Sequence, residues 1–336
     1  MLPVGAVHGI LLIHVSAYSV LSDLNKSRET FGVCMAVPRS LIVYFSQGGT
    51  NARVADAIAA GLRGAGYRVD LWNLRNGRPP DPRDYQLFGI GSPIYYYHMP
   101  VNIAHYVQHL PSLNGIDGFV FIVHGTHRID AANWLRRELS RKGLREVGYF
   151  HCRGEAHVLP LLREGYLFSP DHPSKSELLE AEHFGGAVAE RVAGKPYARP
   201  PYEPRPPFIY RVEKALASRW LIEHFYSRFF RVDPSKCTAC GLCMKVCPTS
   251  NITSDALGRP QWDRRCLVCL SCEMKCPEEA IVSVLSRPFL GALLRPFFRY
   301  NAKRWVREGD LDYVRVVHRR GEINRIDATG KYRPAA

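Results

Sequence analysis

Eight cysteines in the C-terminal half of the chain repeat one spacing twice. In each copy, two residues separate the first cysteine from the second and the second from the third. Three residues separate the third cysteine from the fourth, and a proline follows the fourth directly. Cysteines two residues apart reach three corners of a 4Fe-4S cubane, while the fourth, set off by an extra residue and the proline, reaches a second cluster. We therefore expect one cluster on Cys237, Cys240, Cys243 and Cys276, and another on Cys266, Cys269, Cys272 and Cys247.

Zinc is the alternative metal, because soft thiolates also suit Zn²⁺. Structural zinc sites usually take two short cysteine pairs that lie far apart, and a continuous run of three plus one is hard to arrange around one tetrahedral ion. The spacing favours clusters, and a binding or scaffold module with structural zinc is the competing interpretation. The block that holds these cysteines resembles the two-cluster bacterial ferredoxins. The resemblance implies a small α+β domain that carries single electrons at low potential.

A glycine-containing loop follows an apolar run from Leu41 to Phe45 and precedes a helical stretch. Glycines let the backbone approach a phosphate closely, and the helix N-terminus offers free N–H groups to the anion. The loop has no lysine, which argues against a nucleotide triphosphate site and favours a monophosphate such as that of FMN. A tight strand-to-helix turn without a ligand is the alternative. The candidate phosphate residues are Ser46, Gln47, Gly48, Gly49, Thr50 and Asn51.

An aromatic loop follows a later apolar run, Leu87 to Gly91. Ligands of open α/β sheets bind at the carboxyl ends of the strands, and an aromatic side chain there can stack on an isoalloxazine ring. The alternative is that the tyrosines only cap the sheet. The candidate flavin contacts in this loop are Ser92, Pro93, Ile94, Tyr95 and Tyr96.

Both loops resemble those of the flavodoxin family, whose phosphate loop commonly reads Ser/Thr-x-Thr-Gly-Asn-Thr and whose flavin loop often contains Ser-Pro-Ile/Val-Tyr. This chain departs from the first pattern at Gly48, Thr50 and Asn51, so two hydroxyl donors are missing or displaced. The resemblance implies FMN as the cofactor and gives the flavin site a second wall. That wall consists of His124, Gly125 and Thr126. Reading His124 and His127 as metal ligands is less favoured, because no third ligand is evident nearby.

Strand-like and helix-like stretches alternate from Ser40 onward, which is typical of a parallel sheet with crossover helices. Apolar runs predict strands over 41–45, 67–74, 87–91, 118–123 and 147–152. Helical patterns lie between them, and a closing helix is expected over 174–192. The fold class expected is therefore α/β, with a flavodoxin-like, doubly wound, parallel five-stranded sheet. Cys152 ends the last strand and is expected to be an inert core residue.

Composition divides the chain into five segments. Residues 195–207 contain six prolines and suit a semi-rigid linker, with an aromatic-rich helix expected over 215–230. Residues 1–38 form an extension expected to be poorly ordered; a start at Met35 is preferred over a membrane anchor in the uncharged stretch from Leu2 to Leu21. The segments are 1–38, the FMN-binding domain 39–194, the linker and helix 195–232, the two-cluster domain 233–286 and a basic aromatic tail 287–336.

The formal net charge of +14 implies attraction to something acidic. We expect an acidic redox partner protein, with an anionic membrane surface as a second possibility, and no nucleic acid, because no reader motif accompanies the charge. The tail has twelve Lys/Arg and five Asp/Glu, and either docks such a surface or forms a solvated face with its aromatics packed inward. The cysteine usage predicts the reducing cytoplasm. The basic tail adds peripheral contact with the inner face of the membrane as a second possibility.

The combination of domains resembles the fused flavodoxin–ferredoxin proteins of anaerobic metabolism. The resemblance implies an electron-transfer protein that relays electrons between FMN and two 4Fe-4S clusters and on to a redox partner. The alternative is an FMN-dependent reductase of a small substrate that is fed by its ferredoxin module. Whether the chain is an enzyme is left open by the sequence.

Overall fold

The computed structural model describes residues 37–263, 265–326 and 332–333. The expectation for the N-terminal extension falls almost entirely on residues 1–36, which lie outside the described residues. No helix within the described ranges is long and apolar enough to cross a membrane.

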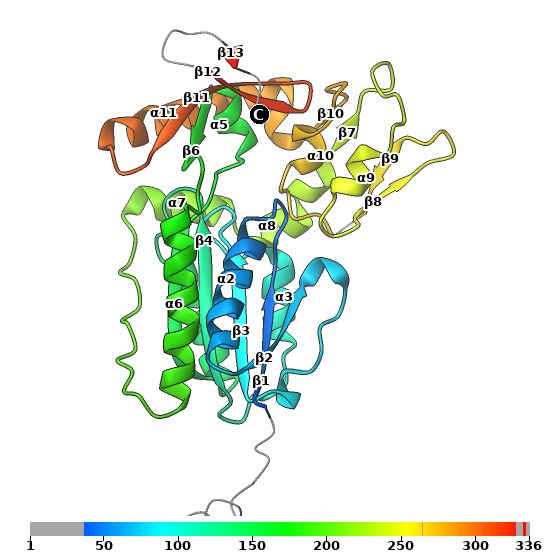
Figure 1. Ribbon diagram of the computed structural model, residues 1–336. Helices are drawn as coiled ribbons and strands as arrows, with labels where there is room; N and C mark the ends of the chain where they lie inside the picture. The colour runs from blue at the N-terminus through cyan, green and yellow to red at the C-terminus, as the bar shows by residue number, and fades with distance from the viewer. Residues whose placement is uncertain (1–36, 264, 327–331, 334–336) are drawn as a thin grey trace, which may run out of the picture. The chain divides into compact units, whose positions relative to one another are not determined.

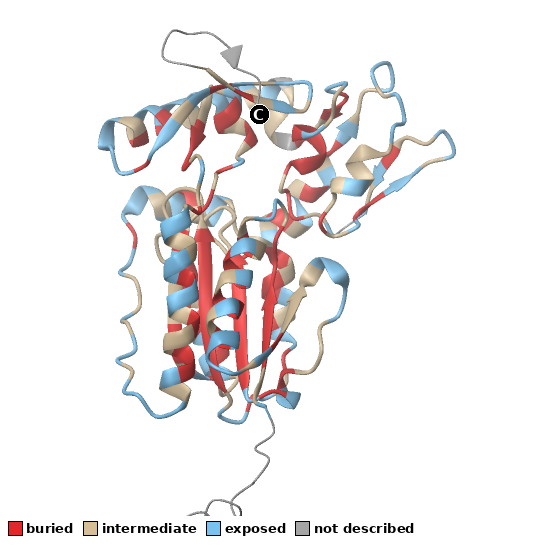
Figure 2. Ribbon diagram, in the orientation of Figure 1, coloured by how far each residue is buried: buried red, intermediate tan, exposed pale blue. Residues whose placement is uncertain are grey.

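The larger part of the structure is a five-stranded parallel sheet of order β2-β1-β3-β4-β5 (Figure 1). Its strands are β1 (Arg39–Tyr44), β2 (Arg68–Asn73), β3 (Leu87–Pro93), β4 (Asp117–His124) and β5 (Arg145–Arg153). The interiors of β1, β3 and β4 are buried on both faces, which is why they read as continuous apolar runs (Figure 2). The predicted flavodoxin-like sheet is confirmed.

Helices cover both faces of the sheet. Helices α2 (Thr50–Gly64) and α6 (Lys175–Val192) pack with alternate strand residues on one face. Helices α3 (Val101–Gln108) and α4 (Ala131–Arg141) share a separate apolar cluster with the other face. Because successive strand side chains point to opposite faces, each buried strand supplies both clusters.

The proline-rich segment is fastened to α4 and β5. The buried guanidinium of Arg136 donates to the carbonyl oxygens of Pro200 and Pro201 at 2.7 and 3.2 Å, and pairs with Glu146 at 2.7 Å. Beyond it the helix expected over 215–230 begins earlier, at Phe208, and is divided. The structure has α7 (Phe208–Leu216), α8 (Arg219–His224) and a 3₁₀ turn at Tyr226–Phe229. Ser218 breaks the helix, because its side chain caps α8 by accepting from the backbone N–H of Leu221.

The cysteine block is built from short elements. Strand β7 (Arg231–Val232) pairs with β10 (Ile281–Val282), and β8 (Ile252–Ser254) pairs with β9 (Pro260–Trp262). Two one-turn helices carry cysteines: α9 (Leu242–Val246) and α10 (Ser271–Met274). The small α+β character expected of this block is confirmed.

The described part of the segment expected as a tail is folded. It forms α11 (Pro288–Glu308), β11 (Tyr313–Arg319), β12 (Glu322–Ile326) and β13 (Tyr332–Arg333). Strand β11 pairs with β6 (Tyr166–Phe168), an excursion of the larger domain that also includes α5 (Leu159–Arg163). Trp305 and Leu311 pack against Phe168 and Leu161 there. Trp305 and, in part, Phe298 therefore bury against the β6 excursion, whereas Phe289 and Tyr300 stay exposed.

Helices α2 and α6 cross at glycines. A Cβ on Gly185 would overlap the backbone carbonyl of Ile58, whereas a Cβ on the neighbouring Gly186 would meet nothing within 4 Å. Gly185→Ala should therefore force the helices apart and lower the free energy of unfolding by about 1–3 kcal/mol. Gly186→Ala should be neutral or raise it by about 0.5–1 kcal/mol through helix propensity. Urea unfolding followed by circular dichroism measures both, and equal effects of the two substitutions would contradict this packing.

Candidate functional site

Two hollows in the cysteine block are each lined by four cysteines, the same two sets of four that share a cluster in the assignment above. The cysteines line the walls of each hollow. Among the described residues, no group of three or more His, Cys, Asp or Glu side chains is placed to hold one metal ion. The first set is Cys237, Cys240, Cys243 and Cys276, and the second is Cys247, Cys266, Cys269 and Cys272.

The two cysteine motifs share an unusual backbone. Residues two and four positions after the first cysteine have positive φ in both copies: 53° at Ala239 and 74° at Gly241, then 52° at Val268 and 61° at Leu270. A branched side chain such as that of Val268 is strained there, and such strain persists only where the surroundings enforce it. The repeated strain marks both loops as functional candidates.

The backbone turns its N–H groups toward sulfur. The amides of Val268, Asn251 and Ala280 donate to the Sγ atoms of Cys266, Cys247 and Cys276 at 3.3, 3.2 and 3.4 Å. Hydrogen bonds of this kind favour the thiolate over the thiol.

Burial acts in the opposite direction. It raises the pKa of Cys266 to about 12 and that of Cys269 to about 11, and nearby cysteines add to both shifts. A bound metal deprotonates its thiol ligands outright, so buried thiols with amide donors are a donor set that fits an iron–sulfur cluster.

The predicted phosphate loop joins β1 to α2. Within the described chain no protein acceptor is bonded to the backbone N–H groups of residues 47–51. Gly49 has a φ of 90°, and a Cβ on it or on Gly48 would meet open space. The buried side-chain oxygen of Asn51 also lacks a partner and could accept from a ligand hydroxyl. Free N–H groups before a helix fit a phosphate, and the open space beside the glycines leaves room for it.

Two side chains of this loop are already engaged. The Ser46 hydroxyl accepts from the backbone N–H of Ala52 at 3.2 Å. The Gln47 amide donates to the Ser271 hydroxyl in the cysteine block and accepts from the Tyr95 hydroxyl at 2.5 Å. Any phosphate here would be held mainly by backbone groups, and the Gln47 side chain connects the loop to the cysteine block.

The aromatic loop after β3 is a tight turn. Tyr95 and His98 exchange backbone hydrogen bonds of 2.9 and 2.8 Å, with φ values of 51° at Tyr96 and 63° at Tyr97, as in a type I′ turn. Such turns prefer Asn and Gly, so two tyrosines here imply that other contacts hold them. At the start of the loop the Ser92 side chain is buried, and the backbone N–H of Ile94 donates to Val123.

The tyrosine side chains reach elements far along the chain. The Tyr96 hydroxyl donates to the carbonyl of Val268 at 2.6 Å, and the Tyr97 hydroxyl donates to Glu213 of α7 at 2.8 Å. Burial raises the pKa of Tyr96 far above its usual value, so its hydroxyl stays a neutral donor. The stacking of an aromatic side chain of this loop on a flavin stays a prediction. What the structure adds is that Tyr96 contacts the cysteine block directly, whereas Tyr95 is connected to it through Gln47.

The loop after β4 turns back on itself. The Nδ1–H of His124 donates to the carbonyl of Thr126 at 2.7 Å, and burial lowers the pKa of His124 to about 4. The ring is therefore neutral at physiological pH. A Cβ on Gly125 would lie 2.7 Å from the Cβ of Ala156, so only glycine fits at this position. The ring of His127 packs on Trp305.

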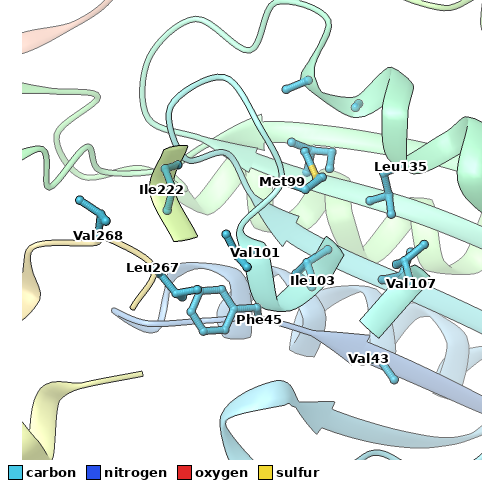
Figure 3. Packing of buried hydrophobic residues seen from close by; sticks show 14 of the residues in the cluster. Val43, Phe45, Met99, Val101, Ile103, Val107, Leu135, Ile222, Leu267 and Val268 are labelled. Atoms are coloured by element: carbon cyan, nitrogen blue, oxygen red, sulfur yellow. The ribbon is translucent and has the colours of Figure 1, made fainter. Parts of the chain in front are cut away.

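Apolar residues complete the junction between the sheet and the cysteine block. Leu267 and Val268 are buried in the same cluster as Phe45, Val101 and Ile222 (Figure 3). Leu267 lies next to the ring of Phe45, the residue that precedes the phosphate loop in the sequence. The sequence analysis missed Val268, Ser271 and Glu213, because no local pattern marks a partner more than 100 residues away.

Family models match two separate segments of the chain. Residues 41–160 match the family model of the flavodoxin domain, and residues 230–253 match that of the 4Fe-4S binding domain. No curated protein matches the chain.

Solved structures were compared as well. A flavodoxin from the domain Archaea is 19% identical, with 46% of this chain and 99% of that chain covered and a TM-score of 0.37. Oxidised flavodoxin 1 from Bacillus cereus is 13% identical over 45% of this chain and 97% of its own, with a TM-score of 0.35. The Flv1 flavodiiron core from Synechocystis is 17% identical over 52% of this chain and 41% of its own, with a TM-score of 0.36.

The Tyr96 hydroxyl should hold the cysteine loop in place. Tyr96→Phe leaves the Val268 carbonyl without its donor and should cost about 1–2 kcal/mol of local stability. Hydrogen–deuterium exchange should therefore become faster at the amides of residues 266–271. Tyr300→Phe, which removes an exposed hydroxyl from α11, is the matched control and should change nothing. Unchanged exchange in Tyr96→Phe would contradict the role of this hydrogen bond.

Proposed function

We propose that this chain, with its flavodoxin domain and its 4Fe-4S binding domain, relays electrons between FMN and two 4Fe-4S clusters and passes them to or from a redox partner. Bound FMN exchanges electrons singly or in pairs and each cluster exchanges one, so the chain would convert between the two kinds of transfer.

The observation that carries this proposal is the direct contact between the candidate flavin loops and one cysteine loop. Gln47 of the phosphate loop bonds to Ser271, and Tyr96 of the aromatic loop bonds to Val268. Both partners lie within the run from Cys266 to Cys272. Electron transfer needs short, rigid separations between centres, and these contacts hold the two sites against each other without a mobile linker.

The contacts also suggest an order for the centres. The set with Cys266, Cys269 and Cys272 adjoins the aromatic loop, because the Tyr96 hydroxyl bonds to the carbonyl of Val268, which lies between Cys266 and Cys269. Cys240, in the other set, is exposed. We therefore assign the set with Cys269 as the neighbour of the flavin, and the set with Cys240 as the one that faces an acidic redox partner.

The surroundings of the aromatic loop favour a carrier over a reductase of a small substrate. The Tyr97 side chain is bonded to Glu213, and the Nε2–H of His98 donates to the carbonyl of Lys214 at 2.9 Å, so α7 covers this side of the loop. A reductase needs a path by which its small substrate can reach the flavin. Thiolate ligands also need a reducing compartment, so we place the protein in the cytoplasm.

Cofactor content tests the proposal. Protein purified without oxygen should contain one FMN, about eight iron and eight sulfide per chain. Reductive titration, followed by visible absorption and EPR, should require about four electrons, two for the flavin and one for each cluster. A protein with zinc in place of iron, or one with clusters and no flavin, would overturn the relay.

Single cysteine substitutions test which residues share a cluster. Cys276→Ala should alter the same EPR signal as Cys240→Ala, and Cys247→Ala the same signal as Cys269→Ala, with about half of the iron lost in each. Cys152→Ala, which removes a buried thiol outside both hollows, is the control and should keep all the iron. The crossed assignment is wrong if Cys276→Ala affects the Cys269 signal instead.

A further inference from the structure

Helices α7 and α8 expose a row of large apolar side chains, which we call the α7–α8 face. The exposed fractions are 73% for Phe208, 43% for Ile209, 39% for Val212, 61% for Leu216 and 64% for Trp220. Helix α11 also exposes large apolar side chains, Phe289 at 82%, Leu293 at 67% and Tyr300 at 55%, but α7 and α8 carry five such side chains within residues 208–220. A cluster of this kind usually marks an interaction site.

The polarity of α7 is reversed with respect to an ordinary surface helix. Residues 208, 209, 212 and 216 fall on one side at the helical period of 3.6, and this side faces solvent. The side that packs inward is polar. Glu213 is buried against Tyr97, and the hydroxyl of Tyr210 accepts from Arg304 of α11 at 3.0 Å. Surface helices normally bury their apolar side, so α7 is built to keep it available.

The charges around the face are of one sign. Arg205, Arg211 and Arg228 are exposed along residues 204–230. The two carboxylates of this stretch are turned away: Glu213 is buried, and Glu223 pairs with His105 of α3 at 2.8 Å. The rim of the α7–α8 face is therefore basic, in a chain whose formal net charge is +14.

We propose that the α7–α8 face binds an anionic lipid surface, with α7 lying in the plane of the membrane interface. Interfacial helices combine Phe, Leu and Trp on the side that enters the lipid with arginines that contact acidic headgroups, and this face has both. The cation-rich rim selects anionic over neutral lipid. This inference does not depend on the cofactors, because it rests on residues 205–228 alone.

Vesicle sedimentation tests the proposal with the full chain. The protein should pellet with phosphatidylglycerol vesicles and weakly or not at all with phosphatidylcholine vesicles. Phe208→Ser/Leu216→Ser/Trp220→Ser should lower the partition coefficient for phosphatidylglycerol roughly tenfold or more, because three apolar side chains no longer leave water. Arg205→Gln/Arg211→Gln/Arg228→Gln should reduce the preference for the anionic lipid.

The matched control replaces exposed apolar residues on other elements. Leu179→Ser/Leu257→Ser, at positions 52% and 67% exposed on α6 and in the β8–β9 hairpin, should bind vesicles like the unchanged protein. Circular dichroism melting checks that each variant is folded. Single Leu216→Ser replaces the triple variant if that variant melts early, with a smaller loss expected.

Three results would overturn the proposal. One is failure of the unchanged protein to bind phosphatidylglycerol vesicles. Another is full binding by a folded triple variant, which would move the lipid contact to another part of the chain, residues 1–36 included. The third is concentration-dependent dimerisation without lipid that the triple substitution abolishes, which would make a second copy of this chain the occupant of the face.

Discussion

The hydrogen bond from the Tyr96 hydroxyl to the Val268 carbonyl joins two strained segments, and the proposed relay depends on it. Tyr96 occupies the left-handed position of a turn that prefers Asn or Gly, and Val268 occupies a left-handed position that a branched residue rarely adopts. Neither conformation is favoured locally, so contacts formed on folding must enforce both. The same contact brings the loop after β3 to the loop between Cys266 and Cys269, which is the junction between the two halves of the proposed relay.

Much of the fold could be predicted because its signals are local. Strands β1, β3 and β4 are buried on both faces and read as uninterrupted apolar runs, and eight cysteines at fixed gaps require loops that wrap around a metal core. The candidate residues for phosphate binding are likewise adjacent in sequence. Their placement between β1 and α2 follows from strand-to-helix connectivity alone.

Long-range contacts could not be predicted in this way. Val268 lies 172 residues from Tyr96, and Glu213 lies 116 residues from Tyr97. Strand β11 completes a sheet begun by β6, far earlier in the chain, so the segment that composition marks as a basic tail is folded. A reversed helix such as α7 misleads in another way. The helix expected over 215–230 overlaps α7 only at its last two residues, so α7 was not predicted, and no local pattern reveals that its apolar side faces solvent.

The polar contacts at this junction are all made by uncharged groups. Among the described residues, the phosphate and aromatic loops are joined to each other and to the Cys266–Cys272 loop by tyrosine hydroxyls, an amide, a serine hydroxyl and a peptide carbonyl, with no ion pair between them. Burial keeps the pKa values of Tyr95 and Tyr96 far above neutrality, so the contacts do not change with pH in the physiological range. Cluster potentials respond to nearby charge and hydrogen bonds. A charged residue in this position would hold the loops equally well, but it would shift the potential of the adjacent cluster whenever its protonation changed. In the proposed relay, neutral donors would join the two loops without adding a charge that changes with pH.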